Sequence, residues 1–110
     1  MINGATNPAF HEHHNPHKAH KTHKTQKLHL NAYTSEDGSK IMGTWICTPG
    51  KWYVEYVKWE YCDFREGYCI ITPEGKEPIH LKAGDIFIVE PGMKGTWEIV
   101  ETVRKYFVFA

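Results

Sequence analysis

The stretch GDIFIVEPGMKGTWEIVETVRKYFV, residues 84–108, decides the fold of this chain. Two tight corners, Gly84-Asp85 and Pro91-Gly92, flank an apolar run at 86–89. Glycine and proline at this spacing end strands and reverse the chain, while β-branched and aromatic residues between them favour strands. The stretch therefore predicts three short strands, at 86–89, 96–100 and 106–109, and no helix.

The same alternation of short apolar runs and turn residues extends upstream to Gly43. Strands are predicted at 44–48, 52–57, 60–64, 68–72 and 78–81. They are separated by turns at Pro49-Gly50, at residues 65–67 and at residues 73–76. Seven or eight short strands at this spacing indicate an antiparallel barrel or sandwich. A core of about eighty residues is small, which favours a homodimer.

The first 31 residues have a different composition. They hold seven of the eight histidines and four lysines against one acid, Glu12. We expect residues 1–31 to form a disordered His/Lys-rich tail and residues 32–110 to form the barrel. The histidine spacing fits no closed metal site, so the tail is expected to bind divalent metals only weakly and adventitiously, and a metal store is the alternative.

Charge and cysteine content narrow the class of protein. The basic surplus lies in the tail, so the folded part shows no nucleic-acid-binding face. The three cysteines show no CxxC spacing, and the sequence shows no signal peptide, so we expect reduced thiols in a cytoplasmic protein. It also has no apolar run of 18 residues, so we expect no membrane partner.

Four local motifs carry a family resemblance. They are Gly84-Asp85, Pro91-Gly92, Gly95-Thr96-Trp97 and the Glu101-x-x-Arg-Lys105 pattern, with Gly43-x-Trp45 upstream. Together with the segment 60–89, they resemble the cupin superfamily and, within it, the (S)-ureidoglycine aminohydrolase-type cupin domain. The resemblance implies an all-β fold, a small single-domain cupin (RmlC-like jelly-roll β-barrel).

The resemblance also implies where the metal ligands of a usual cupin would lie in this sequence. The usual cupin metal site takes a His-x-His pair, a Glu and a further His. With the acid placed at Glu60, no histidine occupies the remaining ligand positions. Those positions are Val54 and Tyr56, or Tyr53 and Glu55, together with Gly95. We therefore expect no metal cofactor in the barrel.

Five residues remain as candidates for a site without metal. Glu60 is the candidate general acid or base, and Lys105 could pair with it or bind a substrate carboxylate. Tyr56, Cys62 and Trp97 are candidate ligand-binding residues. Four of them have a simpler interpretation: Glu60 as a carboxylate neutralised by Lys105, Cys62 as a buried structural thiol, Tyr56 as a barrel-filling ring and Lys105 as solvated surface.

Three functions stay open on this evidence. The first is a small-molecule-binding cupin of unassigned activity, which we favour. The second is an enzyme that resembles the aminohydrolase relatives and acts on a small ureido, amino or carboxylic compound. The third is a structural or assembly barrel filled by its own side chains, which the high aromatic content makes credible.

Overall fold

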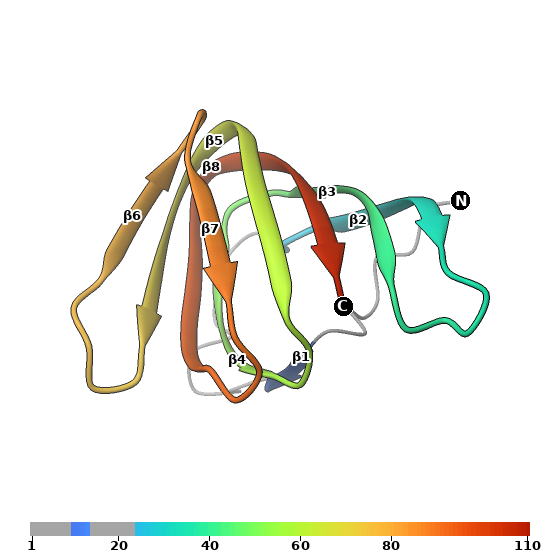
Figure 1. Ribbon diagram of the computed structural model, residues 1–110. Coiled ribbons are helices and arrows are strands. Elements are labelled where there is room, and N and C mark those ends of the chain that lie inside the picture. The colour runs from blue at the N-terminus through green and yellow to red at the C-terminus, as the bar shows by residue number, and fades with distance from the viewer. Residues whose placement is uncertain (1–9, 14–23) are drawn as a thin grey trace.

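The computed structural model describes residues 24–110 and the backbone of residues 10–13 (Figure 1). Every regular element in these residues is a strand, as predicted, and no helix is present that could cross a membrane. The strands are β1 (Phe10–His13), β2 (Lys27–Thr34), β3 (Ile41–Cys47), β4 (Gly50–Tyr56), β5 (Glu60–Pro73), β6 (Ile79–Lys82), β7 (Ile86–Val89) and β8 (Lys94–Phe109).

Strand β8 organises the barrel. Its first half pairs with β4, its second half pairs with β3, and β5 pairs along most of its length. Figure 1 shows β8 and β5 curving together over the top of the molecule, with the β6 hairpin projecting to one side. A single strand thereby contributes side chains to both ends of the interior.

Two interruptions that the sequence predicted between strands are absent. The predicted strands 60–64 and 68–72 form one strand, β5, and 96–100 and 106–109 likewise form one strand, β8. The turn expected at residues 65–67 is a bulged segment, with register shifts between Phe64 and Cys69. Gly67 has φ 92°, and a Cβ there would lie 2.1 Å from the carbonyl oxygen of Thr102. The glycine therefore bends a continuous strand instead of reversing it.

Strand β2 corrects the expected tail boundary. It pairs antiparallel with β3 from Lys27 opposite Cys47 to Thr34 opposite Ile41, so the boundary expected after residue 31 falls inside a strand. Backbone pairing holds this strand, which compensates for its low apolar content. The backbone of β1 also pairs with β4. The rest of the expected disordered tail, residues 1–9 and 14–23, lies outside the described residues.

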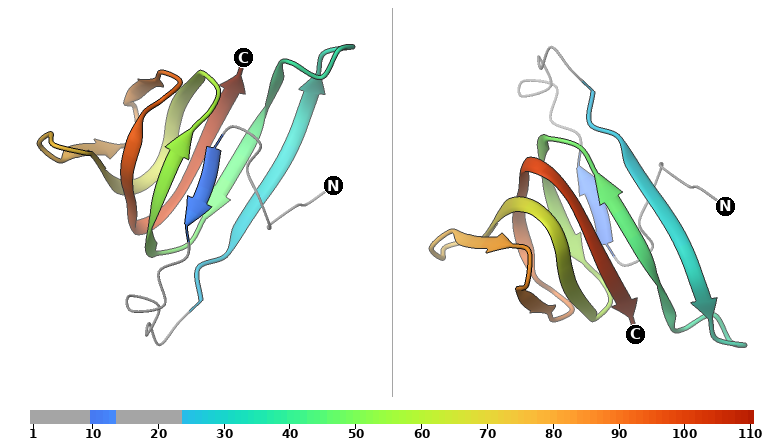
Figure 2. Two further views of the ribbon diagram at one scale, coloured as in Figure 1. Left: turned by 90° about the horizontal axis from the view of Figure 1, so that it is seen from below. Right: turned by 90° about the horizontal axis from the view of Figure 1, so that it is seen from above.

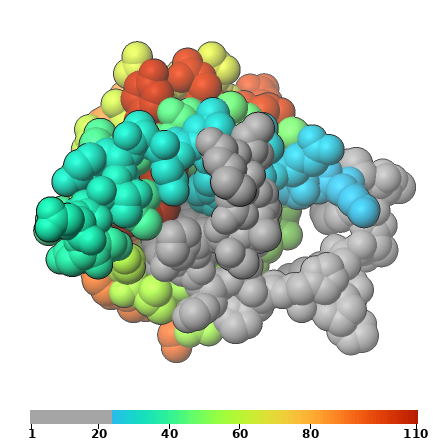
Figure 3. Space-filling view, turned by 90° about the vertical axis from the view of Figure 1, so that its right-hand side faces the viewer, coloured from blue at the N-terminus to red at the C-terminus, as the bar shows by residue number. Residues whose placement is uncertain are grey.

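A glycine allows β2 to lie close to the barrel. A Cβ at Gly43 would lie 2.2 Å from the carbonyl oxygen of Leu30 on β2. Figure 2 shows β2 and β3 running side by side, and Figure 3 shows β2 and the turn after it at the surface of that side of the molecule. Strand β2 therefore extends the sheet as the strand next to β3.

The core follows strict alternation along the strands. In the second half of β8, odd-numbered residues face inward and even-numbered residues face outward. The interior is filled by large side chains, among which the fully buried aromatic residues are Trp45, Trp97, Phe64, Phe107 and Phe109. Two charged residues, Glu60 and Lys105, lie among them.

Candidate functional site

The centre of the site is an ion pair inside the barrel. Lys105 Nζ lies 2.8 Å from Glu60 Oε2, and the two side chains are 1% and 0% exposed. Glu60 begins β5 and Lys105 lies on the adjacent β8, where both occupy inward positions. Charges so removed from water persist only when they are paired and hydrogen-bonded.

Two further polar groups complete this network. The Tyr56 hydroxyl donates a hydrogen bond of 2.6 Å to Glu60 Oε1, so both carboxylate oxygens are engaged. Lys105 Nζ also donates to Cys62 Sγ at 3.4 Å. The candidates Glu60, Lys105, Tyr56 and Cys62 are thus brought together in one buried cluster.

Two tryptophan rings enclose the ammonium group. Lys105 Nζ lies 4.4 Å from the ring centroid of Trp97 and 4.7 Å from that of Trp45, and the two rings meet edge to face at 5.7 Å. Cation–π contacts of this kind strengthen when the cation is desolvated. Trp97 was expected near the site from the sequence, whereas Trp45 was not.

Both tryptophans belong to a Gly-x-Trp pattern, which explains how the cage forms. A Cβ at Gly95 would lie 2.2 Å from the carbonyl oxygen of Thr72, just as one at Gly43 would meet β2. Each glycine therefore lets a neighbouring strand approach, and the tryptophan two residues later points to the same inward side. The repeat of this pattern at Trp45 was the signal in the sequence that could have identified the second ring.

Two buried hydrogen-bond donors of the cage have no partner within the described residues. The buried indole N–H groups of Trp45 and Trp97 reach no acceptor at hydrogen-bonding distance in the described part of the chain, although the Tyr56 hydroxyl lies near that of Trp97. The oxygens of Glu60 already accept from Tyr56 and Lys105. Buried donors are nearly always paired in native proteins, so the two unpaired indole N–H groups set this cluster apart from an ordinary core.

The pKa values of Tyr56, Cys62 and Lys105 are all raised in this cluster. Burial raises the pKa of the Tyr56 hydroxyl well above its usual value, and the charge of Glu60 adds to this effect while the nearby Trp97 indole opposes it. Burial and the charge of Glu60 likewise raise the pKa of the Cys62 thiol. Burial alone would lower the pKa of Lys105, but its contacts with Cys62 and Glu60 outweigh burial and raise it. At neutral pH the cluster therefore holds a cationic lysine, a neutral phenol and a neutral thiol.

These residues do not fit the usual cupin metal. Of the two alternatives for the His-x-His positions, the structure turns Val54 and Tyr56 inward, whereas Tyr53 donates to Glu74 at the surface. Neither inward residue carries an imidazole, and a side chain at Gly95 would collide with the backbone of β5. Glu60, the remaining ligand position, is engaged by the Lys105 ammonium.

No group of three or more His, Cys, Asp or Glu side chains within the described residues is arranged to hold a metal ion.

A histidine assigned to the tail by its sequence context lies at the edge of this cluster. His29 on β2 is 6% exposed, and its ring centroid lies 5.8 Å from that of Phe107 and 6.4 Å from that of Trp45. It pairs opposite Trp45 across the β2–β3 ladder, so both side chains face inward. The other six tail histidines lie outside the residues whose side chains are described.

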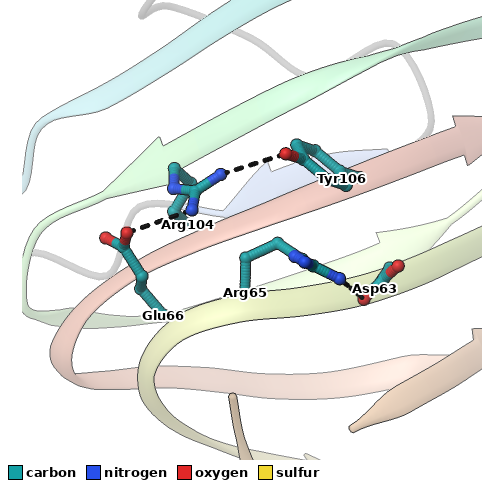
Figure 4. A network of polar contacts seen from close by, with 5 residues as sticks. All are labelled: Asp63, Arg65, Glu66, Arg104 and Tyr106. Carbon is teal, nitrogen blue, oxygen red and sulfur yellow. Dashed lines mark hydrogen bonds and ion pairs between the residues drawn. The ribbon is translucent and has the colours of Figure 1, made fainter. Parts of the chain in front are cut away.

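The outward side of the same strands carries a separate polar network (Figure 4). Arg104 donates to Glu66 at 3.0 Å and to the Tyr106 hydroxyl at 3.4 Å, and Arg65 lies 3.6 Å from Asp63. The structure places Arg104 on the outer face of β8. It takes no part in the buried cluster.

Comparison with known proteins places the fold. The family model of the EutQ-like cupin domain matches residues 34–107. Among solved structures, a putative ethanolamine utilization protein Q from Salmonella typhimurium superposes with a TM-score of 0.66 at 20% identity, covering 96% of this chain and 97% of that one. No curated protein matches the chain.

Two further structures share the fold. Ectoine synthase from P. lautus has a TM-score of 0.69 at 16% identity, covering 88% of this chain and 75% of that one. A DUF861 family protein from Thermotoga maritima has a TM-score of 0.56 at 25% identity, covering 58% and 73%. The family match spans most of the barrel, from the end of β2 almost to the end of β8. This chain therefore belongs to the family of EutQ-like cupin domains.

Proposed function

We propose that this protein is a small-molecule-binding cupin whose ligand lies against the Lys105–Glu60 pair and the two tryptophan rings. The observation that carries the proposal is the pair of buried indole N–H groups, of Trp45 and Trp97, that lack an acceptor at hydrogen-bonding distance in the described residues and lie beside an ammonium group. Small-molecule binding sites commonly combine aromatic walls with a few convergent polar groups. The cluster has that composition.

The chemistry of the cage indicates the class of ligand. The two unpaired indole N–H donors match oxygen acceptors, such as those of a carboxylate or of a ureido or amide carbonyl. The resemblance of residues 84–105 to ureidoglycine aminohydrolase-type cupins favours the same small ureido, amino or carboxylic compounds. The ligand is expected to be small, because aromatic rings occupy most of the interior.

Access to the cluster requires a movement, since Glu60 and Lys105 are sealed from solvent. Strand β2 is the natural element to move, because in the described part of the sheet it pairs with β3 alone. His29 on this strand covers Trp45 and Phe107, so displacement of β2 would open the cage. Edge strands of this kind open at lower free energy than central ones.

The test is direct titration with defined probes, using acetate, glyoxylate, urea and N-carbamoylglycine, by calorimetry and thermal shift. We expect at least one probe to bind the wild type, and Trp45→Phe, which keeps a ring but removes the N–H, to bind it about tenfold more weakly. Trp59→Phe, outside the cage, is the matched control and should bind normally. Absence of binding by all four probes, or unchanged affinity in Trp45→Phe, would contradict the proposal.

The enzyme alternative has its own discriminating variant. Glu60→Gln removes the only carboxylate of the cage while keeping its shape. Loss of turnover with retained binding would assign Glu60 as a general acid or base. No turnover of a bound probe in either form would leave a binding protein.

One observation favours a second candidate function, a structural or assembly barrel. The two charged side chains are completely enclosed by the protein's own aromatic residues. In that case none of the probes binds, and β2 shows the same amide exchange with or without them. Binding that protects β2 from exchange would exclude this alternative.

A further inference from the structure

A second lysine, Lys27 at the start of β2, faces the barrel interior. It pairs opposite the buried Cys47, just as His29 pairs opposite the buried Trp45. Residues paired across an antiparallel ladder project to the same side of the sheet, so Lys27 and His29 both project inward. Lys27 is half-buried whereas His29 is buried, so the lysine lies where the interior meets solvent.

The ammonium group of Lys27 lies over the ring of Trp52 on β4. Its Nζ is 3.8 Å from the ring centroid, and Trp52 is partly buried against the core. The Trp52 ring meets that of Trp45 edge to face at 6.4 Å, and Trp45 meets Trp97 in the same way at 5.7 Å. Three tryptophan rings therefore form a row that leads from the half-buried Lys27 to the fully buried Lys105.

Hydrogen bonds fix the chain immediately before Lys27. The Thr25 hydroxyl donates to the Pro49 carbonyl at 2.8 Å, and the Gln26 amide donates to the Thr48 hydroxyl at 2.7 Å. The Thr48 amide donates back to the Gln26 carbonyl at 3.0 Å. These bonds tie the start of β2 to the turn between β3 and β4. The lysine therefore keeps its place over the row of rings even where the strand beyond it opens.

The row of rings carries a third buried donor at its outer end. Like those of Trp45 and Trp97, the indole N–H of Trp52 is buried and reaches no acceptor at hydrogen-bonding distance within the described residues. Only at Trp52 does this donor lie beside a half-buried ammonium group. A carboxylate has two oxygens, and it accepts stronger hydrogen bonds than a neutral oxygen does. Lys27 and Trp52 together offer the donors that one carboxylate uses.

The two inward lysines differ in how their charge is balanced. Lys105 lies 2.8 Å from Glu60, and such a pair of opposite charges offers an approaching anion little net attraction. Lys27 is the other lysine on the inward side of the described strands. Its position near solvent lets its charge act on a ligand before the ligand enters.

We propose that Lys27 and the Trp52 indole N–H form an outer anion subsite, which takes a carboxylate group of the ligand and makes the barrel select anionic over neutral compounds. The second polar group of the ligand, a ureido or amide carbonyl, then points along the row toward the indole N–H of Trp45. The 6.4 Å between the Trp45 and Trp52 rings suits a compound of a few carbons. This inference rests on the proposed function and adds to it the charge of the ligand, its orientation and the residue that recognises the charge.

The test compares N-carbamoylglycine with its uncharged primary amide by calorimetry at pH 7, because the two compounds differ in charge and hardly in shape. The wild type is expected to bind the acid about tenfold more tightly than the amide, and high salt should reduce this preference. Lys27→Met, which removes the charge and keeps the chain length, should weaken binding of the acid about tenfold and leave binding of the amide unchanged. Lys27→Arg should retain the preference.

Two further variants test the details of the subsite. Trp52→Phe keeps an aromatic face under Lys27 but removes the N–H, so it should also weaken binding of the acid. Lys51→Met is the matched control, because it makes the same change of charge beside Trp52 but on the opposite, exposed side of β4. It should retain the wild-type preference for the acid.

The outcomes distinguish this inference from the proposed function. If the wild type binds neither compound, the proposed function is wrong and the subsite fails with it. If the wild type binds both compounds equally, or if the preference for the acid survives in Lys27→Met, the subsite alone is wrong. An equal loss of preference in Lys51→Met would attribute the selectivity to the overall charge of the protein and would also overturn the inference.

Discussion

The buried Lys105–Glu60 pair makes a quantitative prediction about stability. At 2.8 Å and an effective dielectric constant of about 20, its Coulomb energy is roughly 6 kcal/mol before desolvation is counted. Removing one partner leaves the other buried and unneutralised, which costs about 3–5 kcal/mol in comparable pairs. We therefore expect Lys105→Met and Glu60→Gln each to lower the free energy of unfolding by about 3–5 kcal/mol, a large share of the total for a domain of this size.

Urea unfolding followed by tryptophan fluorescence measures this loss, since two tryptophans adjoin the pair. The double variant Glu60→Gln/Lys105→Met should lose far less than the sum of the single losses, because no unpaired charge remains. Glu55→Gln is the control, since the exposed Glu55–Lys94 pair at 4.0 Å contributes below about 1 kcal/mol. Single variants no less stable than this control would refute the reasoning.

Four further predictions concern the interior of the barrel. Lys105→Ala should regain stability on addition of propylammonium, measured as a rise in midpoint temperature absent from the wild type, because the aromatic cage accepts a free cation. Gly95→Ala should destabilise the fold by about 1–3 kcal/mol in urea unfolding, since its Cβ would meet the Thr72 carbonyl oxygen at 2.2 Å; an unaffected midpoint would contradict this. The pKa values of Tyr56 and Lys105 are raised in the folded state, so their contribution to the free energy of unfolding is complete below about pH 10 and is lost as the pH rises further. The free energy of unfolding should therefore fall in alkali, and it should fall less steeply in Tyr56→Phe. Burial raises the pKa of the Cys69 thiol to about 12, so thiol reagents at pH 8 should label it only after unfolding; rapid labelling of the native protein would disprove its burial.

Much of the fold could be predicted from the sequence, because turn residues and apolar runs are local signals. The strand at 86–89 has the predicted bounds, and Asp85 accepts a hydrogen bond from the amide of Lys82 in the corner before it. The continuity of β5 and β8 could not be predicted. Whether Gly67 bends a strand or ends it depends on the partner strand at Thr102, which the local sequence does not contain.

Part of the candidate site could also be predicted from the sequence. The cupin resemblance indicated that Glu60 and Lys105 could meet, and the Gly-x-Trp repeat was a usable signal for Trp45, whereas His29 could not be placed without the register of β2 against β3. His29 was especially hard to identify, because β2 reverses the usual pattern. Its leucines, Leu28 and Leu30, face outward while its histidine faces the core. A pattern that assumes an apolar interior and a polar surface misreads such a strand.

The interior lysine has a consequence for how this barrel is supplied with its positive charge. A bound ion has to be acquired from the surroundings, competes with other ions and can be withdrawn by a chelator. The ammonium of Lys105 is synthesised with the chain and held by Glu60, Trp45 and Trp97 once the strands close. This cation therefore enters the barrel with the chain itself, and its charge state is set by folding and pH.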